Sequence, residues 1–94
     1  MKRYSIIVEP EAQEDLESIF QFISLNDTAV KAEKFLQELK TQIATLDNLP
    51  FRYRQSYYTE RVGTYDLIYK GYTIVYQVIE ARVHILTIFR QKNY

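Results

Sequence analysis

Residues 65–90 constrain the fold most, because they form three consecutive runs rich in β-branched and aromatic residues. Lys70-Gly71 separates the first two runs, and glycine accepts the positive φ that a tight turn needs. The polar Glu80-Ala81-Arg82 separates the second run from the third. Links this short force neighbouring strands to run antiparallel. The sequence therefore predicts three antiparallel strands, at about 64–70, 72–79 and 82–90.

The middle strand has two chemically different faces, because successive side chains point to opposite sides of a sheet. One face is wholly apolar and must be covered; it consists of Tyr72, Ile74, Tyr76 and Val78. The other face is mixed and is expected to stay partly open; it consists of Thr73, Val75, Gln77 and Ile79. A functional surface is expected on this sheet.

Two amphipathic helices are predicted after a short strand at residues 3–8. Pro10 suits the first turn of the first helix, where its missing N–H costs nothing. Apolar residues then recur at helical spacing in two stripes. The first stripe is Ala12, Leu16, Ile19, Phe20 and Ile23. The second is Ala32, Phe35, Leu36, Leu39, Ile43 and Leu46.

Asn26-Asp27-Thr28 interrupts this pattern, with Asn26 or Asp27 as the expected N-cap of the second helix. The second helix is expected to end near Asp47-Asn48, ahead of Pro50. So short a break predicts an antiparallel hairpin. Phe22 and Leu25 lie off the first stripe. They either meet a partner or, in the favoured interpretation, widen the buried face.

The predicted fold class is α+β, with an N-terminal strand and an antiparallel helical hairpin packed on a twisted, mainly antiparallel sheet. The 94 residues suit one domain. Eight side chains are expected in its core: Leu16, Phe20, Phe35, Leu36, Leu39, Tyr72, Ile74 and Tyr76. Truncation of Phe35 to Ala is expected to cost about 3–5 kcal/mol if that ring is fully buried.

Composition excludes several functional classes. The chain has no cysteine, so it has no disulfide and no thiolate zinc site, which is compatible with the cytoplasm. No apolar run approaches the ~20 residues of a membrane helix. Gly63 and Gly71 are the only glycines and form no phosphate-binding loop. His84 is the only histidine, and a strand position favours packing or exposure over catalysis. We expect no cofactor and no metal.

Charge is unevenly distributed along a chain whose net charge is zero. Residues 1–50 carry five basic and nine acidic side chains, whereas residues 51–94 carry seven basic and three acidic ones. This asymmetry suggests an anionic partner for the second half. The alternative is that solvated helices simply carry more glutamate. Residues 51–63 are expected to be irregular, and their interleaved Arg and Tyr suit either nucleic acid or protein contacts.

The order of these elements resembles one family, and the resemblance covers essentially the whole chain. It rests on Tyr4–Val8 leading into Pro10-Glu11-Ala12 and Asp15-Leu16, on Leu49-Pro50 at the helix exit, on Gly71–Val78, and on the closing Val83–Arg90. The chain resembles toxins of bacterial type II toxin–antitoxin systems, the RelE/ParE superfamily.

The resemblance implies a cytoplasmic growth-inhibiting toxin that forms a hetero-oligomer with a small antitoxin. ParE-like members poison DNA gyrase and RelE-like members cut mRNA on the ribosome; a non-toxic binding module of the same fold is the remaining alternative. The antitoxin is expected to wrap the toxin over apolar surface left by the helices and the sheet edge. Its acidic groups are expected to meet Arg52, Arg54 or Arg61.

RNA cleavage would need cations that stabilise charge on the phosphate. The ribonucleases of the family carry one such arginine on the middle strand, where this chain has Thr73. The remaining catalytic candidates are Arg61, Arg90, Lys92 and Tyr94. Arg90 is expected to share a face with Thr73 and so to compensate in part. We therefore favour ParE-like action and expect weak or absent mRNA cleavage.

Overall fold

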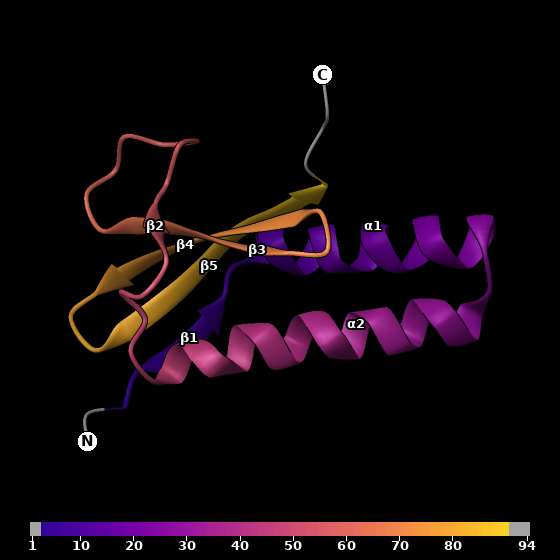
Figure 1. Ribbon diagram of the computed structural model, residues 1–94, viewed down its shortest axis with the longest axis horizontal. Coiled ribbons are helices and arrows are strands. Elements are labelled where there is room, and N and C mark those ends of the chain that lie inside the picture. Colours follow the sequence, from indigo (N-terminus) through magenta and orange to yellow (C-terminus); the bar gives the residue numbers. More distant parts are fainter. Residues whose placement is uncertain (1–2, 91–94) are drawn as a thin grey trace.

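The computed structural model describes residues 3–90, in which a helical hairpin lies along one face of a five-stranded sheet (Figure 1). In chain order the elements are β1 (Ser5–Val8), α1 (Pro10–Asn26), α2 (Ala29–Ala44), the 3-10 helix η1 (Thr45–Asp47), β2 (Arg54–Gln55), β3 (Thr64–Tyr69), β4 (Tyr72–Ile79) and β5 (Arg82–Arg90). The predicted α+β architecture is confirmed. Neither helix between residues 3 and 90 is long and apolar enough to cross a membrane.

The strands follow the order β1-β5-β4-β3-β2 across the sheet. β1 runs parallel to β5, and every other neighbouring pair is antiparallel. The strands predicted at 72–79 and 82–90 have those bounds, and the one predicted at 64–70 ends one residue earlier. β2 was not predicted, because its two residues become a strand only by pairing with Tyr65 and Asp66 of β3.

The turn between β3 and β4 has the chemistry that the sequence indicated. Lys70 has φ 47° and Gly71 has φ 84°. Positive φ at both central residues is typical of the type I′ turn, whose twist matches that of the flanking strands. This short turn fixes Leu67 opposite Ile74, so both side chains lie on the face that the helices cover.

The helix boundaries correct one prediction. Thr28 caps α2, because its Oγ1 accepts a hydrogen bond from the N–H of Lys31 at 3.1 Å. Asn26 and Asp27 were the expected caps, but both belong to the end of α1. The Asn26 side chain donates to the carbonyl of Phe22 at 2.8 Å, so it satisfies α1 and not α2. η1 then continues the second helix to Asp47, near the expected end.

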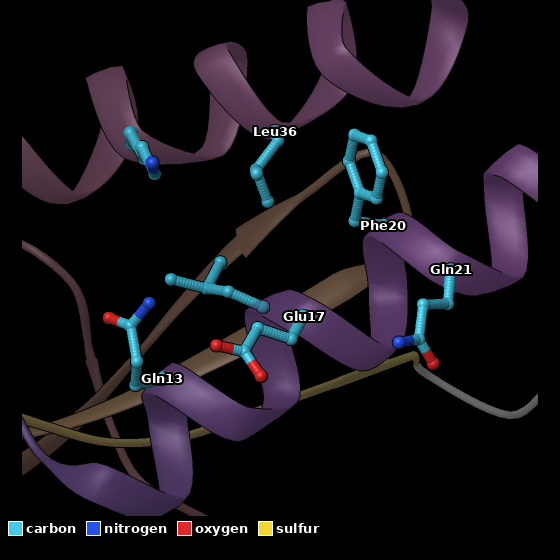
Figure 2. Close-up of a pocket in the computed structure, with 7 residues that line it drawn as sticks. Gln13, Glu17, Phe20, Gln21 and Leu36 are labelled. Atoms are coloured by element: carbon cyan, nitrogen blue, oxygen red, sulfur yellow. The ribbon is translucent and has the colours of Figure 1, made fainter. Parts of the chain in front are cut away.

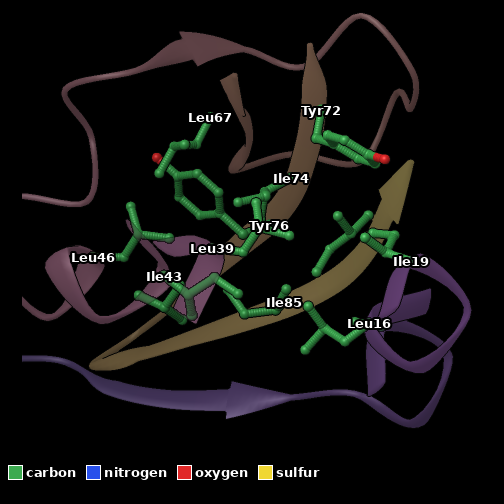
Figure 3. Close-up of a cluster of buried hydrophobic side chains, with 13 residues drawn as sticks. Leu16, Ile19, Leu39, Ile43, Leu46, Leu67, Tyr72, Ile74, Tyr76 and Ile85 are labelled. Carbon is green, nitrogen blue, oxygen red and sulfur yellow. The ribbon is translucent and has the colours of Figure 1, made fainter. Parts of the chain in front are cut away.

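The core lies between the hairpin and the sheet (Figure 3). Five of the eight predicted core side chains are buried: Leu16, Leu39, Tyr72, Ile74 and Tyr76. Phe20, Phe35 and Leu36 are only half-buried. The Phe35 ring packs against Tyr72 and Tyr69, with 5.2 Å and 6.2 Å between ring centroids, but the side chain remains partly exposed. The loss expected for Phe35→Ala therefore falls below that for a fully buried ring.

The favoured interpretation of Phe22 and Leu25 was wrong. Their exposed fractions are 46% and 85%, so neither widens the core. Phe22 instead lines a hollow with Tyr72 of β4 and Arg90 of β5. Leu25 lies in the last turn of α1, and Figure 1 shows that this end of the hairpin projects beyond the sheet.

The mixed face of β4 is more covered than expected. Thr73 and Val75 are buried, while Gln77 is half-buried and Ile79 is exposed. The open part is therefore confined to the end of β4 that precedes β5. The buried part lies beside Asp66 of β3, which is opposite Val75.

Candidate functional site

A buried carboxylate organises the sheet face opposite the helices. The side chain of Asp66 has no exposed surface, and its Oδ2 lies 3.4 Å from Nη2 of Arg54. The same oxygen accepts a hydrogen bond from the N–H of Tyr57 at 3.2 Å. The Arg54 guanidinium also lies over the Tyr57 ring, 4.1 Å from its centroid. Arg54, a predicted antitoxin contact, is thus engaged with its own chain.

Several polar atoms of this cluster are buried without a hydrogen-bond partner among the residues that the structure describes. They are Oδ1 of Asp66, Oγ1 of Thr73, and Nε and Nη2 of Arg54. A buried polar atom left unpaired costs about 1–3 kcal/mol. Arg54, Asp66 and Thr73 are therefore less favourable at these positions than apolar side chains of the same volume would be, and the fold retains them nevertheless.

The β2–β3 loop (residues 56–63) is fixed to the sheet at several points. Thr64 Oγ1 donates to the carbonyl of Arg61 at 2.7 Å, and Gln77 Nε2 donates to that of Val62 at 3.0 Å. The N–H of Val78 donates to the carbonyl of Gly63 at 2.9 Å. A Cβ at Gly63 would lie 3.1 Å from the Val78 carbonyl oxygen, and φ there is +77°. Glycine thus permits the close approach that anchors this loop.

Arg52 and Arg61, the other predicted antitoxin contacts, differ in their engagement. Nη1 of Arg52 donates to the carbonyl of Asn48 at 2.7 Å and lies 3.4 Å from that of Leu49. Arg52 therefore satisfies carbonyl groups that follow the second helix. Arg61 is exposed, and its guanidinium forms no ion pair with any residue between 3 and 90. Of the three arginines, Arg61 is the most open to a partner.

The expectation that Arg90 shares a face with Thr73 was wrong. Arg90 is opposite Tyr72 and Thr73 is opposite Phe89, so the two side chains lie on opposite faces of the sheet. A β-bulge between Val75 and Tyr76 lies in the same strand pair, which alternation alone does not reveal. Arg90 lines a hollow with Ser18, Ile19, Phe22 and Tyr72. Lys92 and Tyr94, the last two catalytic candidates, lie outside the described residues.

Asp15 holds the bulged part of β5. Its Oδ2 accepts hydrogen bonds from Thr87 Oγ1 at 2.8 Å and from the N–H of Ile88 at 2.9 Å. β1 pairs with β5 only as far as Ile85, so this carboxylate satisfies a backbone group beyond the end of β1. Asp15 therefore fixes the strand that carries Arg90.

His84 of β5 contacts Glu9, the residue that precedes α1. Nδ1 of His84 lies 2.8 Å from Oε1 of Glu9, and the histidine is half-buried. The contact ties the residue before α1 to β5. Between residues 3 and 90 there is no group of three His, Cys, Asp or Glu side chains that would hold a metal ion.

Glu38 of α2 links the helices to the β3–β4 turn. Its Oε1 accepts hydrogen bonds from Lys70 Nζ at 2.8 Å and from Tyr69 Oη at 2.5 Å. The hydrogen bond from Lys70 holds the pKa of Glu38 below its usual value, and the bond from Tyr69 acts in the same direction. The same contact with Glu38 raises the pKa values of Tyr69 and Lys70. This cluster ties α2 to the β3–β4 turn, and Glu38 and Tyr69 also line a shallow hollow with Lys34, Gln37, Thr41 and Gln42.

One hollow lies between the two helices (Figure 2), and a second hollow, which shares Gln13, Leu16 and Lys40 with the first, lies toward β1. We call the two together the hairpin groove. Between the helices it is lined by Gln13, Leu16, Glu17, Phe20, Gln21, Leu36 and Lys40. Toward β1 the lining residues are Ile6, Val8, Gln13, Leu16, Lys40, Ile43 and Ala44. Lys40 contributes a cation to both parts. β1 is the terminal strand of the sheet, so its outer edge has no partner strand among residues 3–90.

Comparison with known protein families identifies the family of this chain. Residues 6–93 match the family model described as ParE toxin of type II toxin–antitoxin system, parDE. The chain belongs to the ParE toxin family. Comparison with curated proteins gave no match.

Solved structures of toxin systems share the fold of this ParE-family chain. A chain of the chromosomal ParDE system from P. aeruginosa is 21% identical with a TM-score of 0.82, and the alignment covers 96% of this chain and 98% of that one. A chain of the RelBE2 complex from Mycobacterium tuberculosis is 18% identical with a TM-score of 0.71, covering 99% and 97%. A chain of the YoeB dimer from Staphylococcus aureus is 18% identical with a TM-score of 0.59, and the alignment covers 98% of this chain and 99% of that one. The fold therefore spans ParE, RelE and YoeB toxins.

Sequence reasoning on this ParE-family chain missed two features of the candidate site. The first is the pairing of Asp66 with Arg54, for which the signal was a lone carboxylate inside an apolar strand run. The second is Lys40 in the hairpin groove, for which no sequence signal exists, because the groove forms only when α1, α2 and β1 pack together.

Proposed function

We propose that this chain is a growth-inhibiting toxin that acts on DNA gyrase by protein contact in the ParE manner. The observation that carries the proposal is the family match over residues 6–93. Likeness to RelBE2 and YoeB structures at 18% identity concerns the fold, so it does not favour RNA cleavage. Because the proposed target acts on DNA, the toxin would work in the cytoplasm.

The placement of the candidate cations supports this choice over ribonuclease activity. Thr73, where the family's ribonucleases carry an arginine, is buried and uncharged. Arg90 lies on the opposite face, and Arg54 is paired with Asp66. Phosphate stabilisation needs preorganised cations directed at one point, and loss of one such contact typically costs ~10²–10³ in rate.

We further propose that the antitoxin binds in the hairpin groove. The part of the groove beside β1 is mostly apolar and fits an amphipathic segment, and the unpaired outer edge of β1 accepts an added strand. Lys40 would meet an acidic side chain of that segment. Of the arginines expected to contact the antitoxin, we retain Arg61 as the contact beyond the groove, because Arg52 and Arg54 are engaged within the chain.

Induced expression in bacterial cells tests the toxin proposal. Growth, translation and plasmid supercoiling are followed separately after induction, with and without a co-expressed antitoxin from the neighbouring gene. We expect growth arrest with loss of negative supercoiling before translation falls, and rescue by the antitoxin. An immediate stop in translation with normal supercoiling would reject gyrase in favour of the ribosome. Normal growth would leave only a non-toxic binding module.

Charge reversal in the groove tests the antitoxin proposal. Lys40→Glu should lower the affinity for the antitoxin by about tenfold or more, because a like charge would face the acidic segment. Lys34→Glu is the matched control, since Lys34 is exposed on the same helix but does not line the groove. Equal affinities for the two variants in calorimetry would remove Lys40 from the interface.

A further inference from the structure

The β2–β3 loop exposes several large apolar side chains. Val62 is 89% exposed and Tyr57 is 77% exposed, and Tyr58 and Arg61 beside them are exposed too. We call these four residues the loop surface. Figure 1 places the loop at the end of the molecule away from the turn between α1 and α2.

Exposure in a mobile loop would carry little information, but this loop is anchored. Its backbone is bonded to Asp66, Thr64, Gln77 and Val78 of β3 and β4. The ring of Tyr58 also packs edge-on against Phe89, with 4.8 Å between centroids. A partner that binds a fixed loop pays little for ordering it, which is typical of an efficient binding surface.

The charges of the loop surface favour a protein over a nucleic acid. Arg54 lies beneath the Tyr57 ring and is paired with the buried Asp66, so its charge is not free for a phosphate. Arg61 is the remaining cation, and the exposed Glu60 next to it would repel a phosphate backbone. One cation among aromatic and aliphatic groups instead fits a protein surface that pairs apolar side chains with an acidic one.

We propose that the loop surface is where this toxin contacts its protein target, through apolar groups and an acidic side chain placed against Arg61. The inference rests on the proposed function, because it concerns the surface that produces toxicity. It also gives the Arg61 contact of the antitoxin a role: an antitoxin that reaches Arg61 from the hairpin groove covers the loop surface and excludes the target. The hairpin groove thus binds the antitoxin, and the loop surface binds the target.

Val62→Asp tests this assignment, with Val30→Asp as its matched control. Val30 is 78% exposed on α2, so the two variants make the same change at similar exposure in different places. Growth arrest after induction and inhibition of purified DNA gyrase are measured for both, and equal melting temperatures establish that both fold. We expect Val62→Asp to need at least ~10-fold more protein for inhibition, and Val30→Asp to behave as wild type.

The antitoxin provides the second readout. Lys40→Glu should escape rescue by the antitoxin, whereas Val62→Asp should lose toxicity. Full growth arrest by a folded Val62→Asp would overturn the proposal, and so would equal losses in Val62→Asp and Val30→Asp. A 5′-labelled single-stranded RNA that binds the wild type but not Val62→Asp would place nucleic acid on this surface and overturn the protein assignment.

The outcomes also separate this proposal from the proposed function. A wild-type chain that arrests growth without affecting gyrase would reject gyrase as the target, yet Val62→Asp would still report on the loop surface through growth. A wild-type chain that arrests nothing would overturn both. Gyrase inhibition that persists in Val62→Asp would overturn the loop surface alone.

Discussion

The two faces of the sheet are covered in different ways. On one face, α1 and α2 cover apolar side chains such as Ile74 and Tyr76, and their burial is complete. On the other face, Thr73 and Val75 are also buried, and a paired but incompletely hydrogen-bonded Asp66 holds the β2–β3 loop to the sheet. The helix face is stabilised by burial of apolar area. The loop face is less stabilising, because it buries polar atoms without hydrogen-bond partners among residues 3–90 while Asp66 holds the loop in place. A loop held in this way is suited to binding a partner.

Truncation in the helix face should give the largest loss of stability. Ile74→Ala leaves a cavity at a fully buried position, so we expect a loss of about 2–5 kcal/mol in the free energy of unfolding. Urea denaturation measures it. Ile79→Ala, on the exposed end of the same strand, should change stability by less than ~1 kcal/mol. Similar losses of unfolding free energy in Ile74→Ala and Ile79→Ala would contradict the conclusion that the helix face carries most of the stability.

Removal of the buried carboxylate should give the next largest effect. Asp66→Ala leaves Arg54 without its ion-pair partner and the N–H of Tyr57 without an acceptor. We expect a loss of about 1–3 kcal/mol, toward the lower end because the arginine is partly exposed to solvent.

A double-mutant cycle sharpens the prediction for Asp66. Asp66→Ala and Arg54→Ala should be non-additive by at least ~0.5 kcal/mol if the pair acts as a unit. Faster hydrogen exchange of the β2–β3 loop amides in Asp66→Ala is the second expected result. Additive losses with unchanged exchange would show that the carboxylate does not hold the loop.

Phe35→Ala should cost less than Ile74→Ala. Phe35 is half-buried against Tyr72 and Tyr69, so removal of the ring loses part of its contact area and leaves little cavity. We expect about 1–2 kcal/mol in urea denaturation. A loss as large as that of Ile74→Ala would mean that the open side of the ring is covered in solution.

The smallest expected effect is a pH dependence from Glu38. Its folded-state pKa is lowered, so its contribution to stability is present above the unfolded pKa, near 4.5, and is lost as pH falls through the folded value. The melting temperature of the wild type should therefore exceed that of Glu38→Gln at neutral pH, and this difference should disappear as the pH falls into the acid range. A difference between the two proteins that does not change with pH would remove this carboxylate from the acid response.

The helix face was readable from sequence because its signals are local and periodic. Tyr72, Ile74 and Tyr76 alternate, and the Lys70-Gly71 turn fixes their register against β3. Errors arose where packing decided the outcome. Thr28 caps α2 because α1 runs to Asn26, and Leu25 stays exposed because it lies at the end of the hairpin that projects beyond the sheet.

The candidate site was less predictable, because it depends on contacts between segments far apart in the chain. Arg52 and Arg54 looked like free cations in sequence, but carbonyl groups near Asn48 and the buried Asp66 engage them. Arg90 was placed on the wrong face because one-dimensional alternation does not give the pairing of β5 with β4. The hairpin groove needs three packed elements and leaves no signal in any one of them.

The most direct test of ParE-like action by protein contact combines two assays of the purified chain. One measures supercoiling of relaxed plasmid by DNA gyrase, and the other measures cleavage of mRNA on programmed ribosomes. We predict that the chain inhibits supercoiling at concentrations that leave the mRNA intact. Codon-positioned mRNA cleavage that is lost in Arg90→Ala, together with normal supercoiling, would contradict the account.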